Sequence, residues 1–252
     1  MKMRRWIAIG LGCGGLLVGA NQAKQQEPKQ KVQVSNTQHL DFPSGGTLRL
    51  KNSIGVLTVE GWDRPDMEIT TIKTTKYELD ARGRERAPQE LEKVRVAAER
   101  SGNEVVITTD FPRHAAFPPP LHPKSEVDFA LEYQIKAPAN ARIIDEHHDV
   151  GEVNIDGLTG DIEVNLLQGE IMLHLPEEGQ YTIHAKSDFG NVNSDFSSMD
   201  KRRWWLVGHQ SENGNTAAQH KLNLRVGFGD IVLLKIRIPK PPDSLIRKPE
   251  GL

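Results

Sequence analysis

Apolar and polar residues alternate in short segments along the second half of the chain, and three of these segments share one phrase. Gly151-Glu-Val-Asn-Ile-Asp, Gly160-Asp-Ile-Glu-Val-Asn and Gly169-Glu-Ile-Met-Leu-His each begin with a glycine and an acid, at a step of nine residues. Alternation with a period of two is typical of a strand with one buried face. A step of this length leaves about six residues for a strand and about three for a turn. The pattern therefore predicts repeated β-strands.

Looser copies of the phrase begin at Gly55, Gly179, Gly190 and Gly229. Because all copies share one phase, the third and fifth positions of each are expected to point into the core. These inward positions are Val153, Ile155, Ile162, Val164, Ile171, Leu173, Tyr181, Ile183, Val192, Ile231 and Leu233.

The pattern predicts an all-β fold whose second half, residues 141–239, is a parallel β-solenoid with strands stacked about 4.8 Å apart. In such a stack the strands that begin at Gly151, Gly169 and Gly190 would be successive neighbours. The alternative is an antiparallel β-sandwich or meander, because Asp156-Gly157 is a hairpin signal.

The stacked arrangement makes two predictions about the outer face. The first is a column of Asp156, His174 and Asp195, each five residues after its glycine. The second, from the strands of Gly160 and Gly179, places Asn165 beside His184. A different pairing of strands would separate these side chains.

The first half, residues 32–140, predicts further strands and hairpins. Ser101-Gly102-Asn103 separates two alternating segments, as in a hairpin. Asp80–Leu91 is charged and predicts a short helix or a loop. Residues 111–124 contain five prolines and predict an irregular loop. Residues 240–252 are expected to form a flexible tail.

The start of the chain predicts export. A basic head precedes an uncharged apolar run from Trp6 to Ala20, which is shorter than the roughly 20 residues of a membrane span. Residues 1–20 therefore predict a cleaved signal peptide, and 21–31 a flexible leader. Localisation is expected to be periplasmic, at the cell surface or secreted, with no stable transmembrane span after cleavage. Cys13 is the one cysteine, so a cleaved chain would have no disulfide or thiolate metal site.

Four segments carry a recognisable family likeness. The first, Tyr133-Gln-Ile-Lys-Ala-Pro-Ala-Asn-Ala-Arg, leads directly into the glycine–acid repeats. The others are Ile54-Gly-Val-Leu-Thr-Val-Glu-Gly-Trp-Asp, Ser187-Asp-Phe-Gly-Asn-Val and Val226-Gly-Phe-Gly-Asp-Ile. Together they resemble the putative-adhesin family of bacterial β-strand-repeat proteins. The resemblance covers most of residues 48–238 and implies an exported cell-envelope protein. It carries no catalytic residues that could be transferred.

The chemistry-bearing residues are sparse. Arg203, Trp204 and Trp205 form an aromatic and cationic patch that could contact a sugar or a headgroup. His147-His148-Asp149 is the densest histidine group, but adjacent residues of a strand face opposite ways and would hardly share a metal ion. The repeats lack the Gly-Gly-x-Gly-x-Asp turns of calcium-binding β-rolls. We therefore expect no metal and no cofactor.

Composition and motifs rank the possible functions. With 32 basic and 34 acidic residues, the chain is not expected to bind nucleic acid. It lacks a nucleophile elbow, a zinc-protease motif and a phosphate loop. The leading prediction is a non-enzymatic, exported cell-envelope protein for surface interaction or scaffolding, with a cell-envelope or extracellular protein or glycan as partner. The alternative is a periplasmic glycan- or ligand-binding module, and third is a polysaccharide-active β-helix enzyme.

Overall fold

The part of the chain that the structure describes is all-β apart from one short helix, as the sequence predicts. The structure, a computed structural model, describes residues 28–111, 129–196, 199–203, 208–213 and 218–237, with residues 199–203 described by their backbone. Most of the predicted signal, leader, proline-rich loop and tail lie outside these ranges. The elements are β1 (Gln33–Asp41), β2 (Thr47–Lys51), β3 (Ser53–Trp62), β4 (Asp66–Thr75), α1 (Ala81–Glu92), β5 (Arg95–Ser101), β6 (Glu104–Asp110), β7 (Phe129–Pro138), β8 (Arg142–Asp156), β9 (Ile162–Pro176), β10 (Tyr181–Phe189), β11 (Val192–Ser194), β12 (Met199–Arg203), β13 (Gly208–Glu212) and β14 (His220–Ile236).

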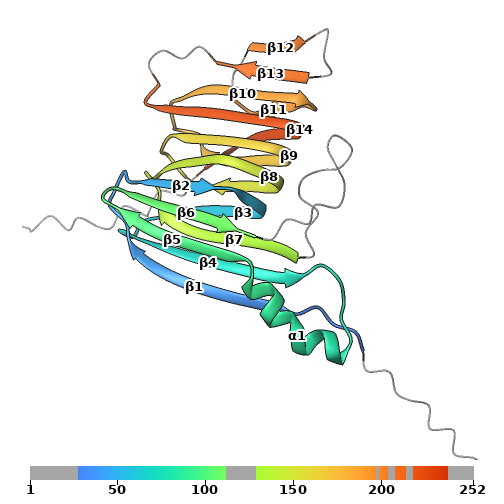
Figure 1. The fold of residues 1–252 in the computed structure, drawn as a ribbon. Helices are drawn as coiled ribbons and strands as arrows, with labels where there is room; N and C mark the ends of the chain where they lie inside the picture. The colour runs from blue at the N-terminus through green and yellow to red at the C-terminus, as the bar shows by residue number, and fades with distance from the viewer. Residues whose placement is uncertain (1–27, 112–128, 197–198, 204–207, 214–217, 238–252) are drawn as a thin grey trace, which may run out of the picture.

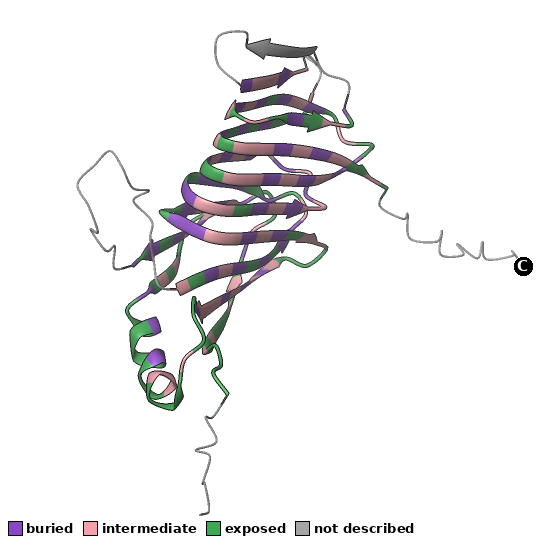
Figure 2. Ribbon diagram, turned by 90° about the vertical axis from the view of Figure 1, so that its right-hand side faces the viewer, coloured by how far each residue is buried: buried purple, intermediate pink, exposed green. Residues whose placement is uncertain are grey.

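Three long strands, β8, β9 and β14, belong to two layers at once. Their N-terminal halves lie in a first layer, in the order β5-β6-β2-β8-β9-β14-β10-β13-β12. Their C-terminal halves lie in a second layer, in the order β1-β4-β7-β3-β8-β9-β14-β11. Figure 1 shows the strands stacked along the molecule, and Figure 2 shows the long strands curving back at one side. One continuous apolar core lies between the layers.

A column of glycines lines the bend between the layers. Gly55 pairs with Gly151, Gly151 with Gly169, and Gly169 with Gly229. Gly190 continues the column beside Gly229. A Cβ on any of these glycines would lie 1.7 to 2.1 Å from a backbone carbonyl oxygen of the neighbouring strand. The close approach explains why the repeated residue is glycine.

The predicted phase of the repeats is confirmed. All eleven inward positions named above are buried, and none exceeds 3% exposure. The bend also shifts this phase within a single strand. In β9 the inward residues are Ile162, Val164 and Leu166 before Gly169, and then Ile171 and Leu173 after it. The glycine therefore sets the register of the second half of each long strand.

The predicted turn before each repeat glycine is wrong at Gly169, because β9 continues through it. The glycine is a bend inside a fifteen-residue strand. Gly157, with φ of 68°, does lie in a turn. The strands that flank this turn, β8 and β9, are parallel, so Asp156-Gly157 does not form a hairpin.

The predicted stacking order is right at one step and wrong at the next. Asp156 lies beside His174 and their side chains form a hydrogen bond. The neighbour of His174 on the other side is Leu234 of β14, so Asp195 lies one strand further away. The long strand β14 lies between β9 and β10 in the first layer. In the second layer it lies between β9 and β11.

The position of β14 also separates the second predicted pair. Asn165 lies beside Arg225 of β14 rather than His184, and Arg225 in turn lies beside Lys186. The sheet as a whole is mixed. The long strands pair with one another in parallel. Antiparallel pairs involve β1, β4, β5, β6, β7, β10, β12 and β13.

Two local predictions for the first half are confirmed. β5 and β6 form the hairpin around Gly102, with Ser101 paired to Glu104. The charged segment after Asp80 is the helix α1. The side chain of Asp80 caps it by accepting a hydrogen bond from the Gly83 N–H at 2.8 Å.

Candidate functional site

The tryptophan patch predicted as a ligand contact is only partly within the described chain. Trp204 and Trp205 lie outside the described residues. Arg203 is the last residue of β12, where its backbone pairs with Gly208 of β13. The patch therefore stays a prediction.

The histidine group divides between the two faces of β8, as the sequence predicts. The side chain of His147 is 56% exposed, and that of His148 is fully buried. His147 Nε2 lies 2.8 Å from Asp149 Oδ1. Across the described ranges, no three His, Cys, Asp or Glu side chains are grouped as metal ligands.

A buried polar cluster of Ser53, Asp145 and His148 lies where β3 meets β8. Ser53 donates to Asp145 Oδ1 at 2.6 Å, and His148 Nδ1 lies 3.0 Å from Asp145 Oδ2. The other ring nitrogen of His148 lies 3.0 Å from the Gly55 carbonyl oxygen, which can only accept. No local pattern in the sequence indicates this cluster, because Ser53 is 92 residues from Asp145.

The arrangement of this cluster differs from that of a catalytic triad. In a triad, the serine hydroxyl is hydrogen-bonded to the histidine that takes its proton. Here Ser53 and His148 both bond to Asp145, which lies between them, and all three side chains are buried. The cluster joins the strands that flank the bend at Gly55 and Gly151.

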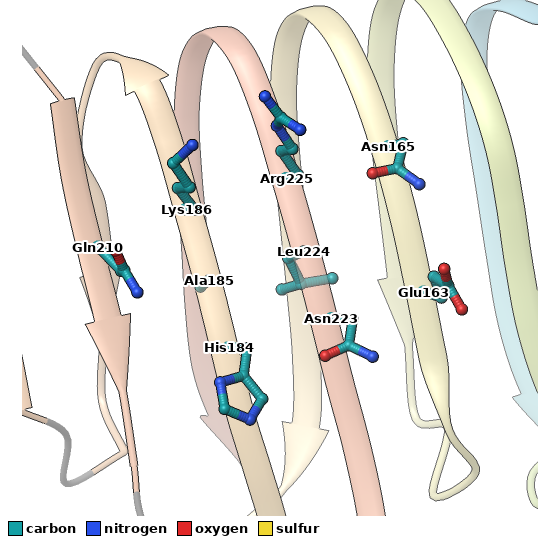
Figure 3. Close-up of a pocket in the computed structure, with 9 residues that line it drawn as sticks. All are labelled: Glu163, Asn165, His184, Ala185, Lys186, Gln210, Asn223, Leu224 and Arg225. Carbon is teal, nitrogen blue, oxygen red and sulfur yellow. The ribbon is translucent and has the colours of Figure 1, made fainter.

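A shallow hollow of about 230 Å³ crosses the outer face of the first layer, over β9, β14, β10 and β13 (Figure 3). Parallel pairing places its polar side chains in two rows, one of which runs Glu163, Asn223 and His184. The other row runs Asn165, Arg225, Lys186 and Gln210. We call these two rows the polar face.

Some groups of the polar face have no partner within the described protein. Arg225 and Lys186 contact Asp188, and Gln210 donates to Glu212. The side chains of Glu163, Asn165 and Asn223 make no hydrogen bond or ion pair to any described residue. The polar face therefore presents two amides and a carboxylate that can bond to an external ligand.

Asp188 joins the two cations at the end of the hollow. Its carboxylate oxygens lie 2.5 Å from Lys186 Nζ and 3.0 Å from Arg225 Nη2. The hydrogen bond from Lys186, aided by that from Arg225, lowers the pKa of Asp188. The carboxylate therefore stays ionised and holds both cations in place on adjacent strands.

This arrangement predicts a pH-dependent stability difference between the wild type and Asp188→Asn. Because the pKa of Asp188 is lower in the folded chain, its contribution is present above the ordinary pKa of about 4 and is lost as the pH falls through the folded value. We expect the wild type to be more stable by at most about 1 kcal/mol at pH 7. Denaturant unfolding of both proteins from pH 7 to pH 3 should show the difference shrinking; a difference that grows toward acid would contradict the assignment.

An apolar patch lies at the bend beside the polar face. The rings of Phe189 and Phe228 stack with centroids 4.7 Å apart. Both are well exposed, as is Leu167 on the adjacent strand β9. The signal for this patch was present in the two Phe-Gly motifs, which place an aromatic residue directly before a column glycine.

One solved structure shares the fold, and a second aligns only weakly. The structure is similar to a "putative cell adhesion protein" from Clostridium sporogenes, at 14% identity over 82% of this chain and 100% of that one, with a TM-score of 0.51. It also aligns with a "putative adhesin" from Parabacteroides merdae, at 9% identity over 81% and 92% of the two chains, with a TM-score of 0.24. No protein-family model matches the chain, and no curated protein matches it in sequence. The first similarity shows the fold alone.

Among the described residues, no helix combines the length and the hydropathy that a membrane crossing requires.

Proposed function

We propose that the protein is an exported, non-enzymatic cell-envelope protein that binds a hydroxyl-rich ligand, a glycan, through the polar face. The observation that carries this proposal is the pair of in-register polar rows, in which Glu163, Asn165 and Asn223 have no partner among the described residues. Such rows repeat at the strand spacing of about 4.8 Å. A chain of sugar rings offers hydroxyl groups along its length and can meet several strands at once.

The chemistry of the hollow supports a polar ligand. An amide both donates and accepts hydrogen bonds, and a carboxylate accepts several, as neighbouring sugar hydroxyls require. The strand positions between the rows, Ala185 and Leu224, direct their side chains into the core. A hydrated ligand that binds here would exchange part of its water for fixed hydrogen bonds to the two polar rows.

The proposal extends to the architecture and to export. The parallel pairing at four steps of the glycine column supports a solenoid-like stack for the long strands, with antiparallel strands added at the ends. The short apolar run from Trp6 to Ala20 supports export to the periplasm, the cell surface or the medium. The structurally similar Clostridium sporogenes protein is described as a "putative cell adhesion protein", and a surface role for this chain would agree with that description.

The carboxylate that lines the hollow supports a binding role over a catalytic one. Glycoside hydrolysis uses two carboxyl groups on either side of the scissile bond. Among the residues that line the hollow the carboxylate is Glu163, and Asp188 outside it is held by Lys186 and Arg225. The Trp204-Trp205 patch is the second candidate for a glycan contact, on the sequence alone.

Binding is tested with the purified protein and a panel of immobilised bacterial and host glycans, measured by biolayer interferometry. For a glycan that binds, Asn165→Ala combined with Asn223→Ala removes two hydrogen-bonding amides of about 1 kcal/mol each. We expect Kd to rise about tenfold or more. The matched control is Asn154→Ala, an amide on β8 in the second layer, which should leave Kd unchanged.

Two results would contradict the proposal. One is a glycan whose Kd is unaffected by the paired asparagine changes, and the other is a panel with no binder. Export is checked on the same protein by fractionation and N-terminal sequencing, where an intact Met1 in the cytoplasm would contradict it.

A further inference from the structure

β1 is an edge strand of the described sheet. Its one partner among the described strands is β4, and no strand lies below β1 in Figure 1. The Thr75 N–H donates to the Val32 carbonyl oxygen at 2.9 Å, and the Val32 N–H donates to Thr75 Oγ1 at 3.0 Å. Because backbone groups alternate in direction along a strand, the odd-numbered residues from Gln33 to Asp41 turn their N–H and C=O groups toward the open edge.

The other sheet edges carry features that discourage pairing. Edge strands of natural proteins are commonly short or charged, because an unpaired strand invites a second one. β11 has three residues, β5 has three charged residues out of seven, and β12 has four out of five. β1 has nine residues and no Lys, Arg, Glu or Pro, and its one acid is the terminal Asp41. β1, which α1 contacts, is thus the edge strand of the described sheet whose sequence carries none of these features.

We propose that β1 pairs with β1 of a second copy of this chain, antiparallel, about a two-fold axis beside Thr37. Thr37 is the centre of the strand, and its backbone groups face the open edge by the alternation above. A two-fold axis there makes each odd residue a hydrogen-bonded partner: Thr37 meets Thr37, Ser35 meets His39, and Gln33 meets Asp41. All backbone groups at this edge then gain partners.

The side chains suit this register on both faces. On the core side, the half-buried Val34 comes beside Leu40 of the second copy, so the apolar layer continues across the axis. Leu40 already packs against the core of its own chain. On the outer side the charged Asp41 lies opposite the neutral Gln33, and no two like charges meet. A second copy is therefore matched to this edge in charge, length and polarity, independently of any ligand on the polar face.

The test is sedimentation velocity of the purified protein over a concentration series. We expect a reversible two-copy species that Thr37→Lys weakens about tenfold or more, because two ammonium groups would then lie opposite each other at the axis. The matched control is Thr108→Lys, an exposed threonine on β6, which is paired on both sides. Thr108→Lys should leave the association unchanged.

The register is tested by oxidation in a Cys13→Ser background. T37C should form a disulfide between copies. The Cα atoms of a hydrogen-bonded pair in an antiparallel ladder lie about 5.5 Å apart, which a disulfide can span. S35C should not form a disulfide, because the two Ser35 positions lie four residues out of register. A protein that stays monomeric over the concentration series overturns the proposal. The β1 edge would then be open to pairing with an extended segment of another protein. A two-copy species that survives Thr37→Lys, or that S35C captures instead of T37C, overturns the proposal as well.

Discussion

Gly169→Ala is expected to destabilise the protein by more than about 4 kcal/mol, enough to unfold many domains of this size. The added Cβ would lie 1.7 Å from the Gly151 carbonyl oxygen, a backbone atom held by the β8–β9 ladder on both sides of the bend. The φ of Gly169, 141°, is also one that other residues rarely adopt. Relief would require β8 and β9 to separate, which breaks ladder hydrogen bonds in both layers. Urea unfolding followed by far-ultraviolet circular dichroism measures the change.

The matched control is Gly102→Ala in the β5–β6 hairpin. Gly102 also has positive φ, 60°, but a Cβ there would meet nothing within 4 Å. The cost should therefore be conformational strain alone, about 1–2 kcal/mol. If Gly169→Ala and Gly102→Ala lowered the free energy of unfolding by the same small amount, close packing at the glycine column would not explain the requirement for glycine.

Asp145→Ala is expected to cost about 3–5 kcal/mol, because it leaves polar groups buried without their partner. Asp145 accepts from Ser53 and contacts His148, and both neighbours are almost completely buried. The site is buried between β3 and β8, away from bulk solvent. The measurement is the free energy of unfolding of Asp145→Ala, of His148→Ala and of the double variant. We expect the double variant to lose less than the sum of the two single losses, since the interaction is removed once.

The control compares the same pair of residue types at the surface. Asp156 and His174 also form a carboxylate–imidazole pair, but their side chains are 42% and 29% exposed. Asp156→Ala should therefore cost at most about 1 kcal/mol. Equal losses for Asp145→Ala and Asp156→Ala would show that burial does not determine the strength of the first pair.

The inward face of the strands could be predicted from the sequence because it is a local property. Val153 and Ile155 follow their glycine in the same phase as Ile171 and Leu173, and the period of two alone places all four on one side. The β5–β6 hairpin and the cap of α1 at Asp80 were also local, since each depends on residues within a single turn.

The order of the strands could not be predicted, because all the repeats alternate apolar and polar residues in the same phase. The strands that contain Gly169, Gly190 and Gly229 present the same alternation, so any two could be neighbours on that criterion. The structure pairs Gly169 with Gly229, which are 60 residues apart in the chain, and places Gly190 beyond. The register of a ladder is decided by how complete strands pack, which no short segment contains.

The polar face depended on this order. Asn165 and Arg225 meet only because β14 lies between β9 and β10, so the predicted neighbour of Asn165 was wrong. The open edge at β1 likewise depends on which strand ends the sheet. No pattern within β1 itself could show that its second side has no partner among the described strands.

By itself the sequence determined a β-rich chain, its repeat phase and the glycine positions. Side-chain alternation and the lack of a Cβ in glycine are both local properties of a few residues. Only the tertiary structure decided that these glycines form one column at a bend. It also decided that Ser53 and His148 share Asp145, and that amides from distant strands form one polar face. These features arise from contacts between residues far apart in the chain. They contribute to the free energy of folding only when the layers have packed.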